Sequence, residues 1–452
     1  MLPRFPLAVP VVLLLAACTL KVGDLGELTT GDSTGDDTGA PATTTAIDVM
    51  TSEPTGGETD DATTTGETGE TGDETTTGAL GPIEGVDILF VIDNSGSMAA
   101  HQKRLSTAIP ALVAPLSAAG LDLRIAVTTT DAGNPRCPSA VTKPEAGALQ
   151  ARSCREGISE GEWLFGQDDL SANCLDSCPH ETITFAPTAT EADPQPAVRP
   201  WIEWTDGAGN VDVPLNEALA CVLPQGIAGC GFESPLESMY LALSRTQDPA
   251  DPGYGFLRTN ADLLVVIVSD ETDCSSAPGG AEIFTDNKVF WNDPEDPVPT
   301  SALCWNAGMQ CSGGPGTYDD CVATDHDLSG AVTDDSNQAV LHPVSRYQGR
   351  LSTILAGKAQ AGSKARVHLA AIAGVPVGYP GNPLVFADGE PEVQANFGIG
   401  PGCESADALA VPPGRIRELV EQTAPLGPGL FSICAPGFES SLASLADGLL
   451  EK

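Results

Sequence analysis

Two apolar runs dominate the hydrophobic pattern of this chain. The run at 86–92 (VDILFVI) is interrupted only by Asp87, and the run at 261–268 is ADLLVVIV. Both are rich in β-branched residues and bounded by polar segments, which is typical of strands buried on both faces of a parallel sheet. Further strands are predicted at 123–130 (LRIAVTTT) and 366–372 (RVHLAAI).

Segments with helical spacing separate these strands. Apolar residues at 105, 109, 112 and 116 recur at helical intervals, and Pro110 and Pro115 among them predict a kink. The same spacing predicts helices at 215–223, 235–246, 343–357 and 414–423, then a strand at 429–434 and a last helix with Leu442, Leu445 and Leu449. Strands that alternate with helices indicate an α/β fold with a mostly parallel central sheet.

A polar cluster follows the first strand directly. Residues 93–97 are DNSGS, so Asp93, Ser95 and Ser97 place one carboxylate and two hydroxyl groups at alternate positions. Ligands of open α/β sheets bind outside the carboxyl ends of the strands. Oxygen ligands suit a hard divalent cation such as Mg²⁺ or Ca²⁺. Asp270 follows the strand at 261–268, so we expect it beside Asp93 at the same edge.

The strand and the DNSGS cluster together resemble the DxSxS signature of the von Willebrand factor A (vWA) domain. The resemblance implies a Rossmann-like fold over residues 85–452, with a metal-ion-dependent adhesion site (MIDAS) that begins with Asp93, Ser95 and Ser97. It also implies that Asp270 is a ligand and that another loop supplies a Thr. Three long segments lack a counterpart in a minimal vWA domain and are interpreted as insertions, near 131–212, 275–340 and 377–412.

The loop expected to supply that Thr departs from the vWA pattern. Ser234 aligns best with the Thr position, and Glu233 before it offers a carboxylate. Ser234, Pro235 and Glu237 also fit a capping box, in which Ser234 satisfies free N–H groups instead of binding metal. A hydroxyl ligand would leave the cation able to capture a partner's carboxylate. Ligation by Glu233 would bind the cation tightly and a partner's acid poorly.

Three more titratable residues lie near these motifs. Glu271 stands where the vWA pattern usually has Gly, and it is interpreted as part of a solvated acidic turn. Asp273 could be either an additional carboxylate of the site or a member of that solvated turn. His101 is expected to face solvent.

Charge narrows the range of partners. The 452 residues include 62 Asp and Glu but only 21 Lys and Arg, which gives a net charge of −41. Such a chain repels nucleic acid and anionic membrane surfaces, and it concentrates divalent cations around itself. Nucleic-acid binding is therefore not expected.

The N-terminal segment predicts export. Residues 1–17 combine Arg4 with a short apolar run, and they end in LAA before Cys18, which resembles the lipobox of bacterial lipoproteins. Cleavage before Cys18 would leave a lipidated thiol as membrane anchor. Thr19 is not the Asp associated with inner-membrane retention, so the outer membrane or cell surface is favoured. Residues 18–82 are rich in Thr, Gly, Asp and Glu and predict a disordered acidic tether before a domain at 83–452.

The cysteine count agrees with export. Of 13 Cys residues, 12 remain after Cys18 is set aside, enough for six disulfides in an oxidising compartment. Cys174 and Cys178 have a spacing seen in zinc sites, but no second Cys or His pair accompanies them. Cys221 and Cys230 flank a Gly-rich link and are candidates to pair with each other.

Other chemistries fit less well. Residues 157–161 match GxSxG but lie in a polar segment, not at a strand-to-helix turn. Asp325, Asp327 and Ser329 resemble half of a calcium loop without its final Glu, so an acidic loop is preferred. A phosphatase using Asp93 as nucleophile would need an acid at the position of Ser95. The chain is therefore not expected to be an enzyme.

The sequence predicts a lipid-anchored envelope protein that binds a protein or glycan partner through a divalent cation. The alternative is a structural or assembly module in which the cation only fixes loops.

Overall fold

The computed structural model describes residues 84–406, 408–423 and 427–451. The predicted signal peptide at 1–17, the lipidation site Cys18 and the tether at 18–82 lie outside these residues. Within the described part of the chain, no helix is both long and apolar enough to cross a membrane.

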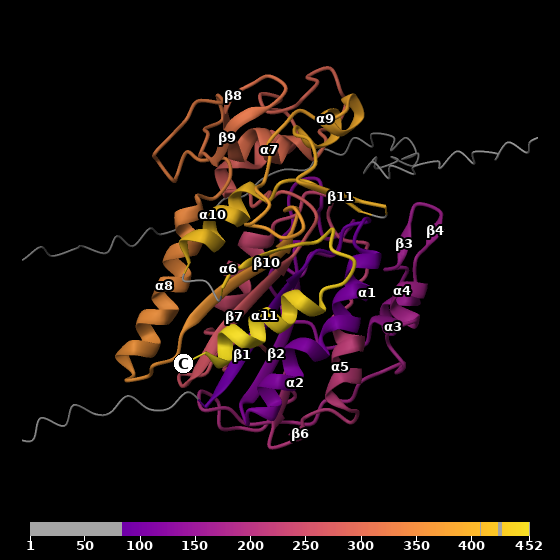
Figure 1. The fold of residues 1–452 in the computed structure, drawn as a ribbon, viewed down its shortest axis with the longest axis vertical. Coiled ribbons are helices and arrows are strands. Elements are labelled where there is room, and N and C mark those ends of the chain that lie inside the picture. Colours follow the sequence, from indigo (N-terminus) through magenta and orange to yellow (C-terminus); the bar gives the residue numbers. More distant parts are fainter. Residues whose placement is uncertain (1–83, 407, 424–426, 452) are drawn as a thin grey trace, which may run out of the picture. The chain divides into compact units, whose positions relative to one another are not determined.

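A seven-stranded sheet forms the centre of the described domain (Figure 1). The strand order is β13-β10-β7-β1-β2-β5-β6; the five strands from β13 to β2 are parallel, and β5 and β6 are antiparallel. This confirms the predicted α/β fold with a mostly parallel sheet. The strand bounds are β1 (Gly85–Ile92), β2 (Asp122–Thr129), β5 (Ile202–Thr205), β6 (Ala208–Gly209), β7 (Ala261–Val268), β10 (Val367–Ala373) and β13 (Leu430–Ser432).

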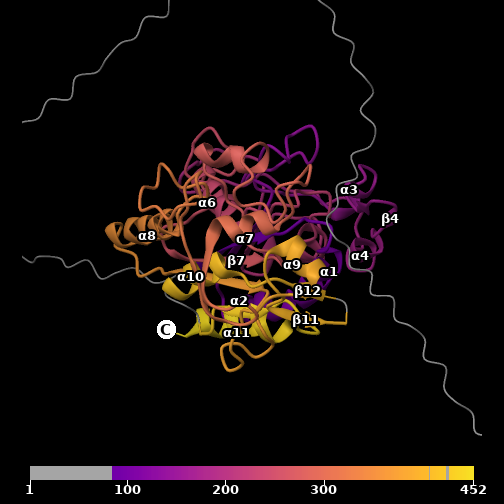
Figure 2. The same cartoon turned by 90° about the horizontal axis from the view of Figure 1, so that it is seen from above.

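Helices cover both faces of this sheet (Figures 1 and 2). Alternate residues of β1 point to opposite sides: Phe90 joins one core cluster, whereas Leu89 joins the other. The Phe90 face packs against α1 (Ala99–Ala108), α2 (Pro110–Ala118), α5 (Leu215–Val222) and α11 (Glu439–Leu450). The Leu89 face packs against α6 (Pro235–Arg245), α8 (Val344–Gln360) and α10 (Gly414–Gln422). Burial on both faces explains why the central strands are almost wholly apolar.

The first helical segment is interrupted at Pro110, one of the two prolines for which a kink was predicted, whereas Pro115 lies inside a continuous helix. The segment forms two helices, because α1 ends at Ala108 and α2 starts at Pro110, with Ile109 between them. Proline lacks the N–H that would continue the first helix, and it is well tolerated at the first position of the second.

The two acidic residues inside the central strands are neutralised by arginine. Asp87 of β1 is fully buried, and its two oxygens accept hydrogen bonds of 2.7 Å from Nε and the backbone N–H of Arg258. Asp262 of β7 pairs with Arg366 in a similar way. These pairs explain how a carboxylate interrupts an apolar strand without an uncompensated buried charge.

The long polar segments contain short elements that the sequence pattern did not predict. The segment interpreted as the first insertion contributes β5 and β6, which extend the sheet beyond β2. Figure 1 shows β8, β9, α7 and α9 grouped beyond one end of the sheet. The bounds of these further elements are α3 (Cys154–Ile158), β3 (Leu164–Phe165), β4 (Asp168–Asp169), α4 (Ala172–Leu175), the 3₁₀ helix η1 (Pro278–Phe284), α7 (Ala302–Gly308), β8 (Met309–Gly313), β9 (Tyr318–Ala323), α9 (Pro391–Phe397), β11 (Cys403–Ser405) and β12 (Ala408–Ala410).

All twelve cysteines of the described domain form disulfides. The pairs are Cys137–Cys230, Cys154–Cys174, Cys178–Cys221, Cys274–Cys304, Cys311–Cys321 and Cys403–Cys434. The predicted number is confirmed, but the suggested Cys221–Cys230 pair is wrong, because each of these residues bonds to a cysteine of the 131–212 segment. Six disulfides indicate a domain that folds in an oxidising, extracytoplasmic compartment.

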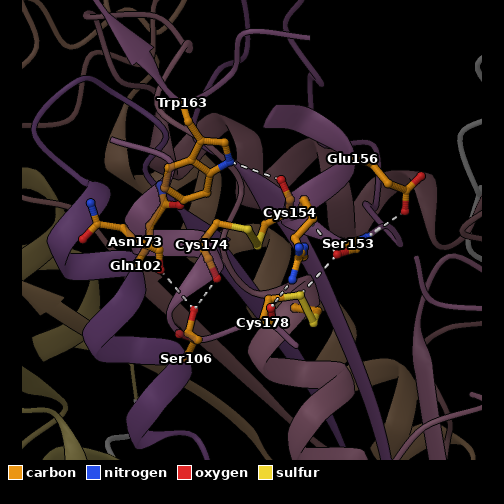
Figure 3. Close-up of a disulfide and its surroundings, with 12 residues drawn as sticks. Gln102, Ser106, Ser153, Cys154, Glu156, Trp163, Asn173, Cys174 and Cys178 are labelled. Carbon is orange, nitrogen blue, oxygen red and sulfur yellow. Dashed lines mark hydrogen bonds between the residues drawn. A yellow bond between two sulfur atoms is a disulfide. The ribbon is translucent and has the colours of Figure 1, made fainter. Parts of the chain in front are cut away.

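The Cys154–Cys174 disulfide joins α3 to α4 within the 131–212 segment, beside α1. Figure 3 shows this disulfide near Gln102 and Ser106 of α1, with Trp163 beside it. The indole N–H of Trp163 donates to the carbonyl of Cys154 at 3.2 Å. Lys103 of α1 pairs with Asp176 at the end of α4 at 2.6 Å, so the cross-linked helices lie against the helix that follows the DNSGS loop.

Candidate metal centre

The carboxyl ends of β1 and β7 meet at the topological switch point of the sheet. After β1, the chain builds the sheet outward through β2, and it then returns to place β7 on the other side of β1. Ile92 lies opposite Val268, so Asp93 and Ser269 follow the two strands at the same level. In open α/β folds this region, outside the strand ends, is where ligands bind.

Asp93 is fully buried and receives hydrogen bonds on both oxygens. Its Oδ1 accepts from the backbone N–H of Ser95 at 2.8 Å, and its Oδ2 accepts from the hydroxyl of Ser269 at 2.6 Å. Sequence reasoning did not single out Ser269. Its position in the sequence could have identified it. Ser269 directly follows β7, as Asp93 directly follows β1, and equivalent positions after adjacent parallel strands lie side by side.

Ser97 links the first loop to Asp270. Its hydroxyl donates to Oδ1 of Asp270 at 3.2 Å, and its oxygen lies 3.3 Å from that of Ser95. Asp93, Ser95 and Asp270 are buried, whereas Ser97 is exposed. The structure thus brings four of the predicted site residues together and leaves Ser97 facing solvent.

Gln102 of α1 binds the backbone of the loop that follows β1. Its side-chain amide donates to the carbonyls of Asp93 at 2.8 Å and Gly226 at 2.7 Å, and its Oε1 accepts from the N–H of Gln225. The side chain is completely buried. It therefore fixes the backbone of Asp93 to the link between α5 and α6, a role that the sequence did not reveal.

Gly96 allows the β3–β4 hairpin to lie against the same loop. A Cβ atom at Gly96 would be 2.2 Å from the ring of Phe165, which is far closer than van der Waals contact. Only glycine leaves room for the ring at this position.

The third loop differs from the sequence prediction in the direction of Ser234. The hydroxyl of Ser234 donates to the carbonyl of Cys274 at 3.1 Å. Ser234 also lines a cavity of about 320 Å³ together with Glu237 and His342, and none of Asp93, Ser95, Ser97 or Asp270 lines it. The hydrogen bonds of Ser234 therefore run to the carbonyls of Cys274 and Thr130 and not to the four clustered residues.

The predicted capping box at the start of α6 is wrong. Ser234 precedes the helix but makes no side-chain cap, and both oxygens of Glu237 pair with Arg346. The free N–H groups of the first turn are satisfied from another loop, because Leu236 donates to Asp273 at 3.1 Å and Glu237 donates to Ser275 at 2.9 Å. A long-range contact has replaced the local cap.

Asp273 consequently has a structural role. It is fully buried, accepts the α6 hydrogen bond through Oδ1, and pairs through Oδ2 with Nε of Arg415 at 2.9 Å. One oxygen of its carboxylate binds the N-terminus of α6 and the other binds a buried arginine, so both are engaged within the protein.

Glu233 and Glu271 are both buried near the cluster. Oε2 of Glu233 accepts from the hydroxyl of Thr130, and Oε1 has no hydrogen-bond partner among the described residues. Glu271 is 6% exposed, so the expected solvated turn is wrong for this residue. His101 is also buried, 1% exposed and stacked on Phe438, although it was expected to face solvent.

Burial raises the pKa of each carboxylate, and the charge of Asp93 raises the pKa of its neighbours further. Burial and then the charge of Asp93 raise the pKa of Asp270 to about 8. Burial is also the main cause of the raised pKa of Asp93, and of Glu233 and Glu271, whose pKa values lie well above the ordinary value. The charge of Asp93 contributes to the last two as well. The site is therefore a poorly solvated cluster of acidic side chains, and a cation bound there would be stabilised by their charge.

The donor set fits a hard cation. Asp93 and Asp270 supply carboxylate oxygens, and Ser95 and Ser97 supply hydroxyls, which are ligands suited to Mg²⁺ or Ca²⁺. No three His, Cys, Asp or Glu side chains of the described ranges are grouped so that they could hold a metal ion by themselves. Any ion here would thus depend on the serine hydroxyls as well as on the carboxylates.

The alternative calcium loop forms an acidic turn instead. Oδ1 of Asp327 accepts from the N–H groups of Ser329 at 2.8 Å and Ala331 at 3.1 Å. Asp325 faces the buried guanidinium of Arg415 at 3.9 Å. These contacts agree with the preferred interpretation.

The sequence matches no protein-family model, and comparison with curated proteins gives no match.

Proposed function

We propose that this protein is an exported lipoprotein whose vWA-like domain binds a divalent cation and, through it, a protein or glycan partner at the cell envelope. The cation, Mg²⁺ or Ca²⁺, would be held by Asp93, Ser95, Ser97 and Asp270, and the domain would bind its partner without catalysing a reaction. The observation that carries the proposal is the Ser97–Asp270 hydrogen bond, which joins two strand-end loops at the switch point of the sheet.

Three features support the vWA-like assignment. The DxSxS sequence follows a buried strand, an Asp follows the adjacent parallel strand, and the sheet is of the doubly wound type in which ligands bind at this edge. The assignment rests on this combination of motif and topology.

The direction of β1 favours presentation of the site to a partner. The chain enters the domain at Gly85 and reaches Asp93 eight residues later, at the opposite end of a strand about 26 Å long. The predicted anchor is attached on the Gly85 side. A partner approaching Ser97 would therefore meet the end of the domain that is remote from the point of attachment.

A second candidate function is a structural module in which the cation only fixes loops. The observation in its favour is the burial of Asp93, Ser95 and Asp270, which leaves Ser97 as the exposed member of the four. The two functions differ in whether an outside group must reach the ion.

The test compares Asp93→Ala with Asp447→Asn, a change at an exposed position of α11. Each full-length protein would be used to capture partners from envelope extracts with Mg²⁺ or Ca²⁺ and after EDTA. We expect capture by the parent and by Asp447→Asn only with the cation, and no capture by Asp93→Ala, although circular dichroism shows it folded. Capture that survives EDTA would refute the binding function. A loss of fold on cation removal would favour the structural module.

A further inference from the structure

The cavity of about 320 Å³ beside α6 is a separate hollow at the same edge of the sheet. It is bordered by the loop after β2, by the start of α6 and by residues 276–281 beyond β7. Its volume falls within the range of small-molecule sites, and ligands of open α/β sheets bind outside the carboxyl ends of the strands. Because no candidate cation ligand of the strand-end cluster lines it, this cavity can be considered by itself.

Disulfides cross-link two walls of the cavity. The Cys137–Cys230 disulfide lies next to the wall that follows β2, and the Cys274–Cys304 disulfide lies next to the wall beyond β7. Walls that are fixed in this way are formed before a ligand enters. Binding therefore costs little conformational entropy of the protein.

A short antiparallel pairing brings His342 to the cavity. The N–H of His342 donates to the carbonyl of Ser275 at 2.9 Å, and the N–H of Ala277 donates to the carbonyl of Val340 at 2.9 Å. Nε2 of His342 lies 3.9 Å from Oε2 of Glu237, which is too far for a hydrogen bond. The ring lines the cavity and makes no hydrogen bond within the described part of the chain, so its nitrogens can bind a ligand.

The lining of the cavity carries no uncompensated charge. Glu237 and His342 are the titratable residues that line it. Both oxygens of Glu237 bind Arg346, and its Oε2 also accepts from the hydroxyl of Tyr347 at 3.2 Å. Burial lowers the pKa of His342, so its ring is neutral at neutral pH. An ionic ligand would therefore lose its hydration without gaining a charged partner.

The chemistry of the lining defines the ligand class. A neutral imidazole has one hydrogen-bond donor and one acceptor, and a hydroxyl group can bind either of them. Apolar side chains form much of the remaining lining: Ala132, Pro135, Leu241, Ala277, Pro278 and Ala281. A ligand that combines a hydroxyl group with an apolar body would use both parts of this lining.

We propose that this cavity binds a small uncharged molecule with a hydroxyl group and an apolar body. The hydroxyl group binds the imidazole of His342, and the apolar body packs against Leu241 and Ala281. This site works independently of the cation site, because the two share no residue.

The experiment measures binding of cyclohexanol to the full-length protein in EDTA by saturation-transfer NMR. Ala281→Leu places a larger apolar side chain at the wall, and His342→Phe keeps a ring but removes both nitrogens. Ala356→Leu, at an exposed position of α8, is the matched control. We expect saturable binding to the parent and to the control. Binding should be about ten-fold weaker in Ala281→Leu, and about five-fold weaker in His342→Phe, which loses one ordinary hydrogen bond.

Three results would overturn this inference. The first is a parent that does not bind cyclohexanol saturably, and the second is Ala281→Leu that binds it as tightly as the parent. The third is equal binding by His342→Phe and the parent, which also decides the matter if circular dichroism shows Ala281→Leu unfolded. Since EDTA is present throughout, none of these results bears on the proposed cation-dependent function.

The preference for an uncharged ligand is tested with cyclohexanecarboxylate and cyclohexylammonium as probes. Both have the ring of cyclohexanol, but they carry a negative and a positive charge in place of its hydroxyl group. We expect each to bind the parent at least about ten-fold more weakly than cyclohexanol does. A charged probe that binds as tightly as cyclohexanol would overturn the assigned ligand class.

Discussion

The hydroxyl of Ser97 donates a hydrogen bond of 3.2 Å to Oδ1 of Asp270, and these residues lie 173 positions apart in the chain. The contact joins the loop after β1 to the loop after β7. Because the two strands are parallel and in register, their first polar residues meet at one edge, where the predicted cation would bind.

Asp270→Asn should weaken Ca²⁺ binding without destabilising the fold. Asparagine still accepts from Ser97, and it removes a buried charge next to Asp93. We expect Ca²⁺ affinity to fall at least ten-fold, while the cation-free variant has the parent's melting temperature or a higher one. Calorimetry and thermal denaturation check both points. A cation-free variant that melts well below the parent would instead show that the ionised Asp270 stabilises the fold.

Stabilisation by Ca²⁺ should increase with pH. The pKa of Asp270 is raised from 3.8 to about 8 in the folded protein, so the cation-free fold loses stability as pH rises through this range. A bound cation removes that cost, because it favours the ionised carboxylate. The rise in melting temperature on adding Ca²⁺ should therefore be larger at about pH 8 than at about pH 5. An equal rise at both pH values would contradict the prediction, and Asp270→Asn should weaken the dependence.

Asp273→Ala should destabilise the protein strongly, whereas Asp273→Asn should leave cation affinity unchanged. The alanine variant leaves the guanidinium of Arg415 buried without its partner and removes an acceptor from the start of α6. Loss of one partner of a buried pair costs about 3–5 kcal/mol. Urea unfolding measures the first effect and Ca²⁺ titration the second. A ten-fold loss of Ca²⁺ affinity in Asp273→Asn would place this residue in the site after all.

Arg258→Ala should cost about 3–5 kcal/mol, since it removes the guanidinium that compensates the buried charge of Asp87 inside β1 and leaves only the backbone N–H of residue 258 to donate to that carboxylate. The matched control is Lys103→Ala, which breaks the exposed pair with Asp176 and should change stability by less than about 1 kcal/mol. Both values come from denaturant unfolding with the disulfides intact. Similar losses of unfolding free energy in the two variants would show that the burial of Asp87 does not determine how much its ion pair stabilises the fold.

Gly96→Ala should destabilise the domain by about 1–3 kcal/mol, because the new Cβ meets the ring of Phe165. Removing the ring in the double variant Gly96→Ala/Phe165→Ala should cost less than the sum of the two single changes. A double-mutant cycle on unfolding free energies checks this coupling. Additive effects would mean that the hairpin does not rest on the loop.

The parallel strands of the sheet, and the edge at which Asp93 and Asp270 lie, could be predicted from the pattern of apolar residues alone. Buried strands need continuous apolar runs, and parallel strands must end at the same edge, so the runs before Asp93 and Asp270 were sufficient to predict that these residues meet. The interruption of the helix at Pro110 could also be predicted from local sequence, because proline has no backbone N–H to donate to the preceding turn.

The contacts of the third loop and the pairing of the cysteines could not be predicted from the sequence, because they depend on long-range contacts. Ser234 and Glu237 have the local pattern of a capping box, yet Asp273 and Ser275 from a distant loop satisfy the helix, and this frees Ser234 to turn toward Cys274. Cys221 likewise bonds to Cys178 instead of its neighbour Cys230. These choices depend on which segments the fold brings together. A one-dimensional pattern records the hydrogen-bonding capacity of each side chain, but not which distant partner will meet it.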